Sequence, residues 1–197
     1  MFDSKEKIGL QVFMKQYYLP LITEMVDNEV DSLYIEINKN TPPIIISKEQ
    51  IKFELTLLFL KTSGYGLSQI KGLDERFYGQ QALIEDEYLR TNFAHIELDP
   101  KLLSGKEYML AFSDQFIYCK NKTKSYHQYE QLYRQDKIRK QDFPFIISGI
   151  FFAPICDYKT VNEPLALAIG ELHKSSLIYL HQRLSSLAKK YQITPDI

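Results

Sequence analysis

Two short apolar runs near the C-terminal end constrain the fold of this chain more than any other feature. The first covers residues 143–155 and the second covers residues 165–169, with the polar segment 157–163 between them. Two apolar runs joined by a polar turn pair most readily as a β-hairpin. Residues from about 175 to 191 follow with helical spacing of apolar side chains. The pattern predicts a terminal hairpin and a closing helix over residues 143–191.

The first third of the chain predicts a helix, a strand and a second helix. Apolar residues recur at helical spacing over much of residues 1–28, which predicts an amphipathic helix with a kink at Pro20. Alternating apolar residues over 33–37 indicate a strand, followed by a loop over residues 38–43 and a further stretch of strand at residues 44–46. Ser47 with Gln50 resembles a capping box, so a helix is expected to begin there and to end near the glycines that follow Ser63.

The middle of the chain predicts two more helices and another hairpin. A polar, acidic helix is expected within residues 74–94, a hairpin over residues 108–118, and a loop and helix within residues 120–142. We find no linker and no internal repeat, so residues 1–197 are interpreted as one domain. The predicted fold class is α+β, with a mixed, mainly antiparallel sheet and packed helices.

Charge and hydropathy limit the classes of partner. A formal net charge of -1 provides no overall attraction to nucleic acid or to an acidic membrane. The longest apolar run, residues 143–155, is far shorter than the roughly 20 residues that span a bilayer, and the first seven residues lack the apolar core of a secretion signal. We therefore expect a cytoplasmic protein with no membrane partner.

The segment Ala153 to Thr160, with its Pro154-Ile155 step and polar turn, resembles the end of GAF-type sensor domains. In that family an apolar strand, a polar turn and a last strand precede a closing helix. The resemblance covers the last third of the chain. It implies an antiparallel sheet that cups a small ligand, with a signal carried through terminal helices.

A non-enzymatic sensor or regulatory domain that binds a small ligand is the leading functional prediction. Its ligand would lie between the sheet and a covering helix, against aromatic side chains with polar contacts nearby. The candidate ligand-binding residues are Tyr108, Phe112, Tyr118, Tyr126, His127 and Phe151. The closing helix has one broad apolar face, which serves either as a homodimer surface or for packing on the sheet.

Nucleic-acid binding is the alternative prediction, and it has two sequence signals. The segment 48–73 has the layout of a helix-turn-helix and is similar to the helix pair of MerR-type regulators in its Gly64, Tyr65, Leu67 and Ile70 spacing. A basic run over residues 120–140 with interleaved tyrosines suits a phosphate backbone and stacked bases. The candidate residues are Ser68, Gln69, Lys71, Lys122, Lys124, Arg134, Lys137, Arg139 and Lys140.

A third prediction rests on Arg90 and His95. Their spacing resembles that of HEPN-type ribonucleases, in which an arginine and a histidine act on an RNA phosphodiester. Histidine exchanges a proton near neutral pH and arginine stabilises a charged phosphorane, so this pair is chemically competent. HEPN domains are helical, whereas the predicted hairpins indicate a sheet, and this difference argues against the nuclease.

Motifs for other chemistry are missing from the sequence. It contains no Walker loop, no GxGxxG and no GxSxG, and its two cysteines lack metal-binding spacing. His173 and His181 are eight residues apart, too far along a helix to share a metal ion. We therefore predict no cofactor and no metal, and favour a binding or regulatory role over an enzymatic one.

Overall fold

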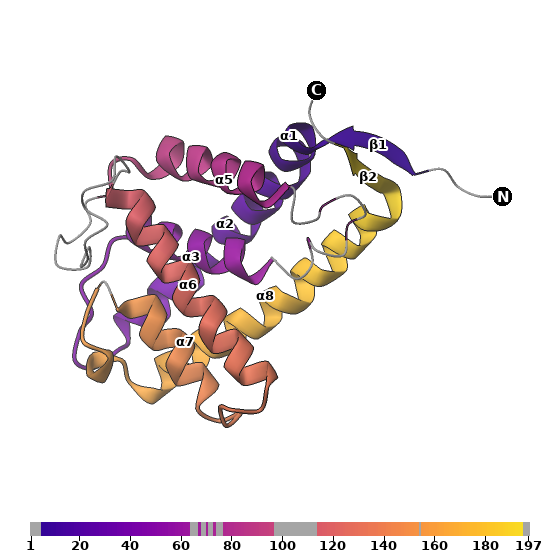
Figure 1. Ribbon diagram of the computed structural model, residues 1–197. Helices are drawn as coiled ribbons and strands as arrows, with labels where there is room; N and C mark the ends of the chain where they lie inside the picture. Colours follow the sequence, from indigo (N-terminus) through magenta and orange to yellow (C-terminus); the bar gives the residue numbers. More distant parts are fainter. Residues whose placement is uncertain are drawn as a thin grey trace.

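The computed structural model describes residues 5–63, 67, 70, 73, 77–96, 114–153 and 155–194, and this part of the chain is mostly helical (Figure 1). It contains one two-stranded parallel sheet. The elements are β1 (Glu6–Gly9), α1 (Leu10–Phe13), the π-helix η1 (Met14–Tyr18), α2 (Leu19–Asn38), α3 (Lys48–Thr62), α5 (Tyr78–Phe93), α6 (Asp114–Arg134), α7 (Phe143–Phe152), the 3-10 turn η5 (Tyr158–Thr160), α8 (Glu163–Lys190) and β2 (Tyr191–Thr194). The predicted α+β fold with a mainly antiparallel sheet is wrong.

The predicted terminal hairpin is a pair of packed helices instead. Residues 143–152 form α7, and residues 165–169 lie in the first turns of α8. Pro144 and Pro164 each stand in a first helical turn, where a missing N–H costs nothing, and the side chain of Asn162 accepts a hydrogen bond from the Leu165 N–H at 3.0 Å. A continuous apolar run suits a buried helix as well as a buried strand. Here α7 is such a helix, because it packs between α6 and α8.

The predicted strand at residues 33–37 belongs to α2. Val30, Leu33 and Ile37 are buried at helical spacing, while Ile35 is 55% exposed. The apolar alternation over residues 33–37 therefore does not reflect a strand. It arises because the exposed Ile35 happens to lie between two buried residues of a helical apolar face. Residues 44–46 lie in the connection to α3, without regular structure.

The predicted second hairpin is wrong over residues 114–118, the part of it that the structure describes. Phe116 and Tyr118 lie in α6, which begins at Asp114 and replaces both the second strand and the loop expected after residue 120. Residues 108–113 lie outside the described part of the chain. The sheet expected to cup a ligand is thus not present in the described residues.

α3 lies at the centre of the helical bundle. The side chain of Ser47 accepts a hydrogen bond from the Gln50 N–H at 3.1 Å, as the capping signature predicts, and the helix ends at Thr62. Residues 53–60 are buried around the whole circumference, because α3 packs against α2, α6 and α8, and Phe53 also meets Phe93 of α5. A helix apolar on most sides belongs in the middle of a fold.

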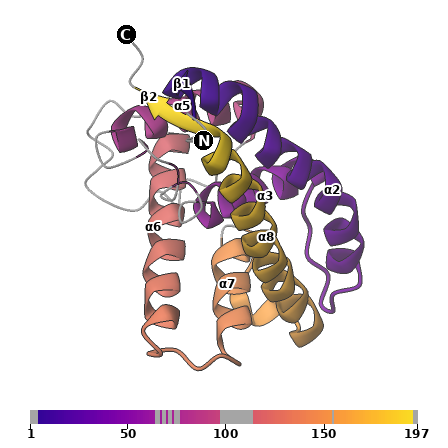
Figure 2. The same cartoon turned by 90° about the vertical axis from the view of Figure 1, so that its right-hand side faces the viewer.

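The two ends of the described chain are joined by the small sheet. β1 and β2 pair in parallel, with Glu6 opposite Tyr191 and Gly9 opposite Thr194. The Tyr191 hydroxyl donates to that of Tyr17 at 2.9 Å, and Lys5 donates to the carbonyl of Ala188. Figures 1 and 2 show this sheet beyond the last turn of α8, next to α1. It fixes the end of α8 against the start of the N-terminal helix.

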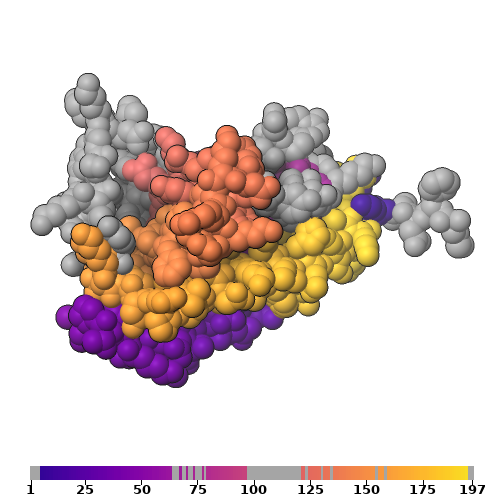
Figure 3. Space-filling model, turned by 90° about the horizontal axis from the view of Figure 1, so that it is seen from below, coloured from indigo at the N-terminus to yellow at the C-terminus, as the bar shows by residue number. Residues whose placement is uncertain are grey.

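α8 crosses the molecule between α2 and the pair α6 and α7. Seen from below in Figure 3, it forms a band from orange to yellow above the purple surface of α2. Ser176, Leu180 and Leu184, which mark its predicted apolar face, are buried, and α8 packs against α2, α3 and α7. This part of the apolar face is therefore covered by helices of the same chain, and not left open for the homodimer that we also considered.

Candidate functional site

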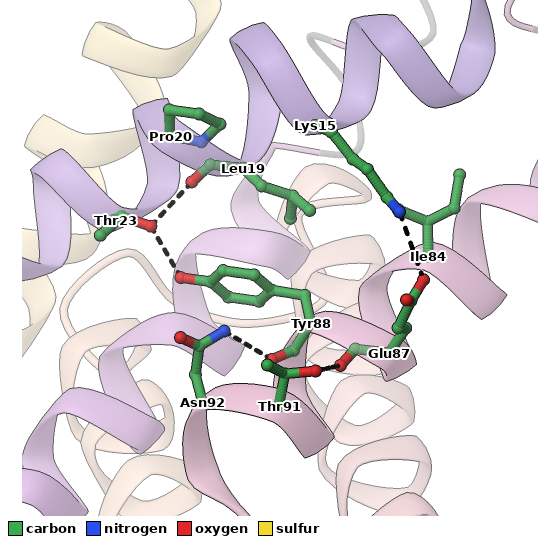
Figure 4. A pocket seen from close by; sticks show the side chains of 9 residues that line it. All are labelled: Lys15, Leu19, Pro20, Thr23, Ile84, Glu87, Tyr88, Thr91 and Asn92. Atoms are coloured by element: carbon green, nitrogen blue, oxygen red, sulfur yellow. Dashed lines mark hydrogen bonds and ion pairs between the residues drawn. The ribbon is translucent and has the colours of Figure 1, made fainter.

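A groove between the N-terminal helix and α5 is the candidate site. Its volume is about 470 Å³, and one wall comes from η1 and α2 and the other from α5 (Figure 4). This is within the usual size range of small-molecule pockets. We call it the α2–α5 groove, and it is lined by Lys15, Leu19, Pro20, Thr23, Ile84, Glu87, Tyr88, Thr91 and Asn92.

The first wall changes helix type at the groove. The Leu19 N–H donates to the Met14 carbonyl, the i→i+5 pattern of a π-helix, and the α-helix resumes with Pro20 in its first turn. Proline has no N–H to give to the carbonyl four residues earlier, so the regular α-helical ladder cannot run through this point. Single π-turns are frequent at functional sites. Here one lies directly beside the groove.

A hydrogen bond between Thr23 and Tyr88 joins the two walls. The Thr23 hydroxyl donates to the Leu19 carbonyl at 3.0 Å, so across the 2.7 Å contact with Tyr88 the tyrosine hydroxyl donates. Figure 4 shows the Tyr88 ring reaching from α5 toward Thr23. On α5, the Asn92 amide donates to the Tyr88 carbonyl at 2.8 Å. Polar groups therefore occur at defined positions in a groove whose other walls are Leu19, Pro20 and Ile84.

An ion pair between Lys15 and Glu87 spans the two walls. The Lys15 Nζ lies 3.7 Å from the Glu87 Oε2, and the side chains are 47% and 60% exposed. That separation is longer than a hydrogen bond, so both groups retain hydrogen-bonding capacity. The groove thus offers one cation and one anion close together, Lys15 on one wall and Glu87 on the other.

Next to Ile84 of the groove, α5 carries a half-buried carboxyl, that of Glu85. Glu85 accepts a hydrogen bond from the Gln81 amide at 2.8 Å and is also hydrogen-bonded to Tyr18. Burial of the carboxyl raises the pKa of Glu85 to about 7, although hydrogen bonds from Gln81 and Tyr18 and the charge of Lys61 oppose the shift. Burial likewise raises the pKa of Tyr18, whose hydroxyl lies 2.5 Å from that of Ser63. A strongly perturbed group beside a groove is a common mark of a functional site.

A second buried polar cluster lies between α3 and α6. Lys122 pairs with Glu54, with side chains 5% and 1% exposed, and donates to the Phe151 carbonyl at 2.9 Å. The Lys122 ammonium also lies 5.7 Å from the centre of the Phe151 ring. The hydroxyl of Tyr126 is buried and has no hydrogen-bond partner among the described residues, and burial, with a contribution from the charge of Glu54, raises the pKa of this hydroxyl.

The candidate ligand-binding residues are divided between this cluster, an exposed position and undescribed parts of the chain. Tyr126 and Phe151 are both buried around Lys122. His127 is exposed, with Lys61 at 3.0 Å and Gln131 at 2.7 Å from its ring nitrogens. Tyr108 and Phe112 lie outside the described residues, as does the side chain of Tyr118, whose backbone belongs to α6.

The basic residues proposed for nucleic acid are likewise divided. Lys122 is buried in its ion pair, whereas the exposed ones are Lys124, Lys137, Arg139 and Lys140. Arg139 bonds both carboxylate oxygens of Asp142, at 2.6 and 3.1 Å. Ser68, Gln69 and Lys71 lie outside the described residues, as does the side chain of Arg134.

The residues of the nuclease prediction lie at the end of α5. Arg90 is in the last turn and His95 in the turn that follows, and both are exposed. The Arg90 Nε lies 2.9 Å from an Asp86 carboxylate oxygen. Neither residue lines the α2–α5 groove, which uses the neighbouring face of α5.

Sequence reasoning did not find the α2–α5 groove. Its signals are present but unspecific: Pro20 inside a helical pattern, and polar residues Thr91 and Asn92 near the end of a polar helix. Which faces of the two helices meet is a tertiary property, and neither segment specifies its partner.

No protein-family model matches this chain, and no curated protein and no solved structure is significantly similar to it. Among the described residues, no group of three or more His, Cys, Asp or Glu side chains is arranged to hold a metal ion. No helix in the described part of the chain is long and apolar enough to cross a membrane.

Proposed function

We propose that this protein is a non-enzymatic regulatory protein that binds a small molecule in the α2–α5 groove. The observation that carries the proposal is the groove itself, a ligand-sized hollow that combines apolar walls with a few fixed polar groups. The proposal keeps the ligand-binding role and moves the site away from the aromatic residues selected from the sequence.

The construction of the groove suits a regulatory role. Its walls come from residues 15–23 and residues 84–92, which are far apart in the chain. A ligand that contacts both walls stabilises their mutual position, and binding to the folded state raises stability by mass action. Tyr88 then senses whether a ligand is bound in the groove, because its hydrogen bond to Thr23 joins the two walls.

A fragment screen by protein NMR tests the proposal. We expect bound fragments to shift the amide signals of residues 15–23 and 84–92 and to raise the melting temperature. Thr91→Trp places an indole in the groove from an exposed position and should abolish both effects. Leu83→Trp is the matched control, because Leu83 is on the same helix, 68% exposed and outside the groove. Fragments that bind Thr91→Trp as well as the wild type, or no shifts at these amides, would refute the proposal.

The ribonuclease is the second candidate function. One observation favours it: the described chain is mostly helical, so the predicted sheet no longer argues against a HEPN-type protein. The exposed positions of Arg90 and His95 also leave them accessible to RNA. Cleavage of RNA that His95→Ala abolishes would support this candidate, and cleavage that survives the substitution would end it.

Nucleic-acid binding without cleavage stays a prediction for the exposed residues Lys124, Lys137, Arg139 and Lys140. Neutralising phosphates releases counterions, so real binding weakens steeply as salt rises. Retention on DNA or RNA at low salt, reduced by Lys137→Gln with Lys140→Gln, is the expected result. No retention at low salt would contradict it.

A further inference from the structure

We propose that the ligand of the α2–α5 groove is a zwitterion of the α-amino-acid class with an apolar side chain. Its carboxylate would bind Lys15 and its ammonium would bind Glu87, while its side chain would lie on Leu19, Pro20 and Ile84. This inference rests on the proposed function, because it names the ligand of the same site.

The ion pair at the groove is easily opened. Lys15 and Glu87 are about half exposed, and their 3.7 Å separation is too long for a direct hydrogen bond. Exposed pairs of this kind contribute little to stability. A ligand that separates the two charges therefore loses little, provided that it gives each of them a new partner.

The charge balance of the site selects among ligand classes. An anion bound at Lys15 faces the nearby carboxylate of Glu87, and a cation bound at Glu87 faces the ammonium of Lys15. Either singly charged ligand gains one attraction and one repulsion. A molecule with adjacent opposite charges satisfies both side chains, so the two charges discriminate in its favour.

The remaining walls fit the rest of such a ligand. Figure 4 shows the ends of Lys15 and Glu87 meeting beside Ile84 of α5, with Leu19 between this pair and the Thr23–Tyr88 hydrogen bond. An apolar side chain of the ligand would cover Leu19, Pro20 and Ile84. The hydroxyl of Tyr88 lies beyond these residues, and its bond to Thr23 leaves its oxygen able to accept from a polar ligand group.

Calorimetric titration with three related probes tests the inference. The probes are phenylalanine, phenethylamine and 3-phenylpropionate, which share a ring and differ in their charges. We expect phenylalanine to bind the wild-type protein at least tenfold more tightly than either singly charged probe. Lys15→Met should lower its affinity to that of phenethylamine, and Glu87→Gln should lower it to that of 3-phenylpropionate. Both substitutions are at exposed positions, and unchanged melting temperatures would show that the fold is intact.

The controls separate this inference from the proposed function. Binding of phenylalanine that Thr91→Trp abolishes and Leu83→Trp preserves supports both. If a singly charged probe binds as tightly as phenylalanine and Thr91→Trp blocks it, the groove is a ligand site but the zwitterion inference is wrong. If none of the three probes binds, the inference also falls, and the fragment screen alone decides the proposed function.

Discussion

Gly170 of α8 lies directly against Pro144 of α7. A Cβ atom added at Gly170 would be 2.5 Å from the Pro144 Cβ and 2.9 Å from its Cα. Real Cβ atoms do not approach backbone this closely, so the contact exists only because residue 170 has no side chain. It sets the close approach of the two helices that replace the predicted hairpin.

Gly170→Ala should therefore destabilise the protein by about 1–3 kcal/mol, the usual cost of overpacking, because α7 must move away from α8. Urea unfolding measures the change. Gly149→Ala is the control within α7, where an added Cβ meets nothing within 4 Å, and alanine should stabilise the helix by about 0.5–1 kcal/mol. Equal effects of the two substitutions would show that the helices are not in this contact.

Lys122→Met should be among the most destabilising changes in the core. It leaves the Glu54 carboxylate buried without its cation, which typically costs about 3–5 kcal/mol. The double variant with Glu54→Leu should lose less than Lys122→Met alone, because no charge then remains. Lys48→Met provides the exposed comparison, since its pair with Asp31 at 2.7 Å is open to solvent and contributes little to stability. Chemical denaturation of all three variants checks the order.

Local signals in the sequence predicted single helices but not how they assemble. Ser47 and Gln50 located the start of α3 because a cap is an interaction between near neighbours. Residues 143–152 were assigned to a strand because a run of apolar residues has no periodicity to measure. Only burial between α6 and α8 explains why this run is a helix, and that burial depends on residues far away in the sequence.

The candidate sites show the same division. A helix was expected within residues 120–142, and Tyr126, one of the tyrosines interleaved with the basic run, is buried in α6. The basic run placed Lys122 among the residues for nucleic acid, whereas it pairs with Glu54, 68 residues earlier. A buried lysine cannot be identified without its partner, because the two charges are stable in the core only together.

Tyr126→Phe should stabilise the protein by about 1 kcal/mol. Within the part of the chain that the structure describes, the Tyr126 hydroxyl is buried without a hydrogen-bond partner, and an unsatisfied buried polar group costs about 1–3 kcal/mol. Phenylalanine keeps the ring and removes that group. Tyr18→Phe is the matched control, because its equally buried hydroxyl lies 2.5 Å from that of Ser63 and its loss should destabilise. A loss of stability in Tyr126→Phe by thermal unfolding would mean that the hydroxyl has a partner in solution.

The stability of the protein should fall as the pH rises through the titration of Glu85. The pKa of this carboxyl is about 7 in the folded protein and about 4.5 when the group is exposed by unfolding. Between these values the folded state holds a proton that the unfolded state has released, so the free energy of unfolding decreases with rising pH and levels off above about pH 7.

Glu85→Gln should remove this dependence, because the amide stays neutral beside Tyr18, Lys61 and Gln81. Urea unfolding should show that the free energy of unfolding of the wild type falls between pH 5 and pH 8. This fall should exceed that of the variant by about 1–3 kcal/mol. Glu87→Gln, two residues further along α5 and 60% exposed, should keep the wild-type pH profile. A wild-type profile in Glu85→Gln would show that the carboxyl is ionised in the folded protein, and that hydrogen bonds from Tyr18 and Gln81 outweigh its burial.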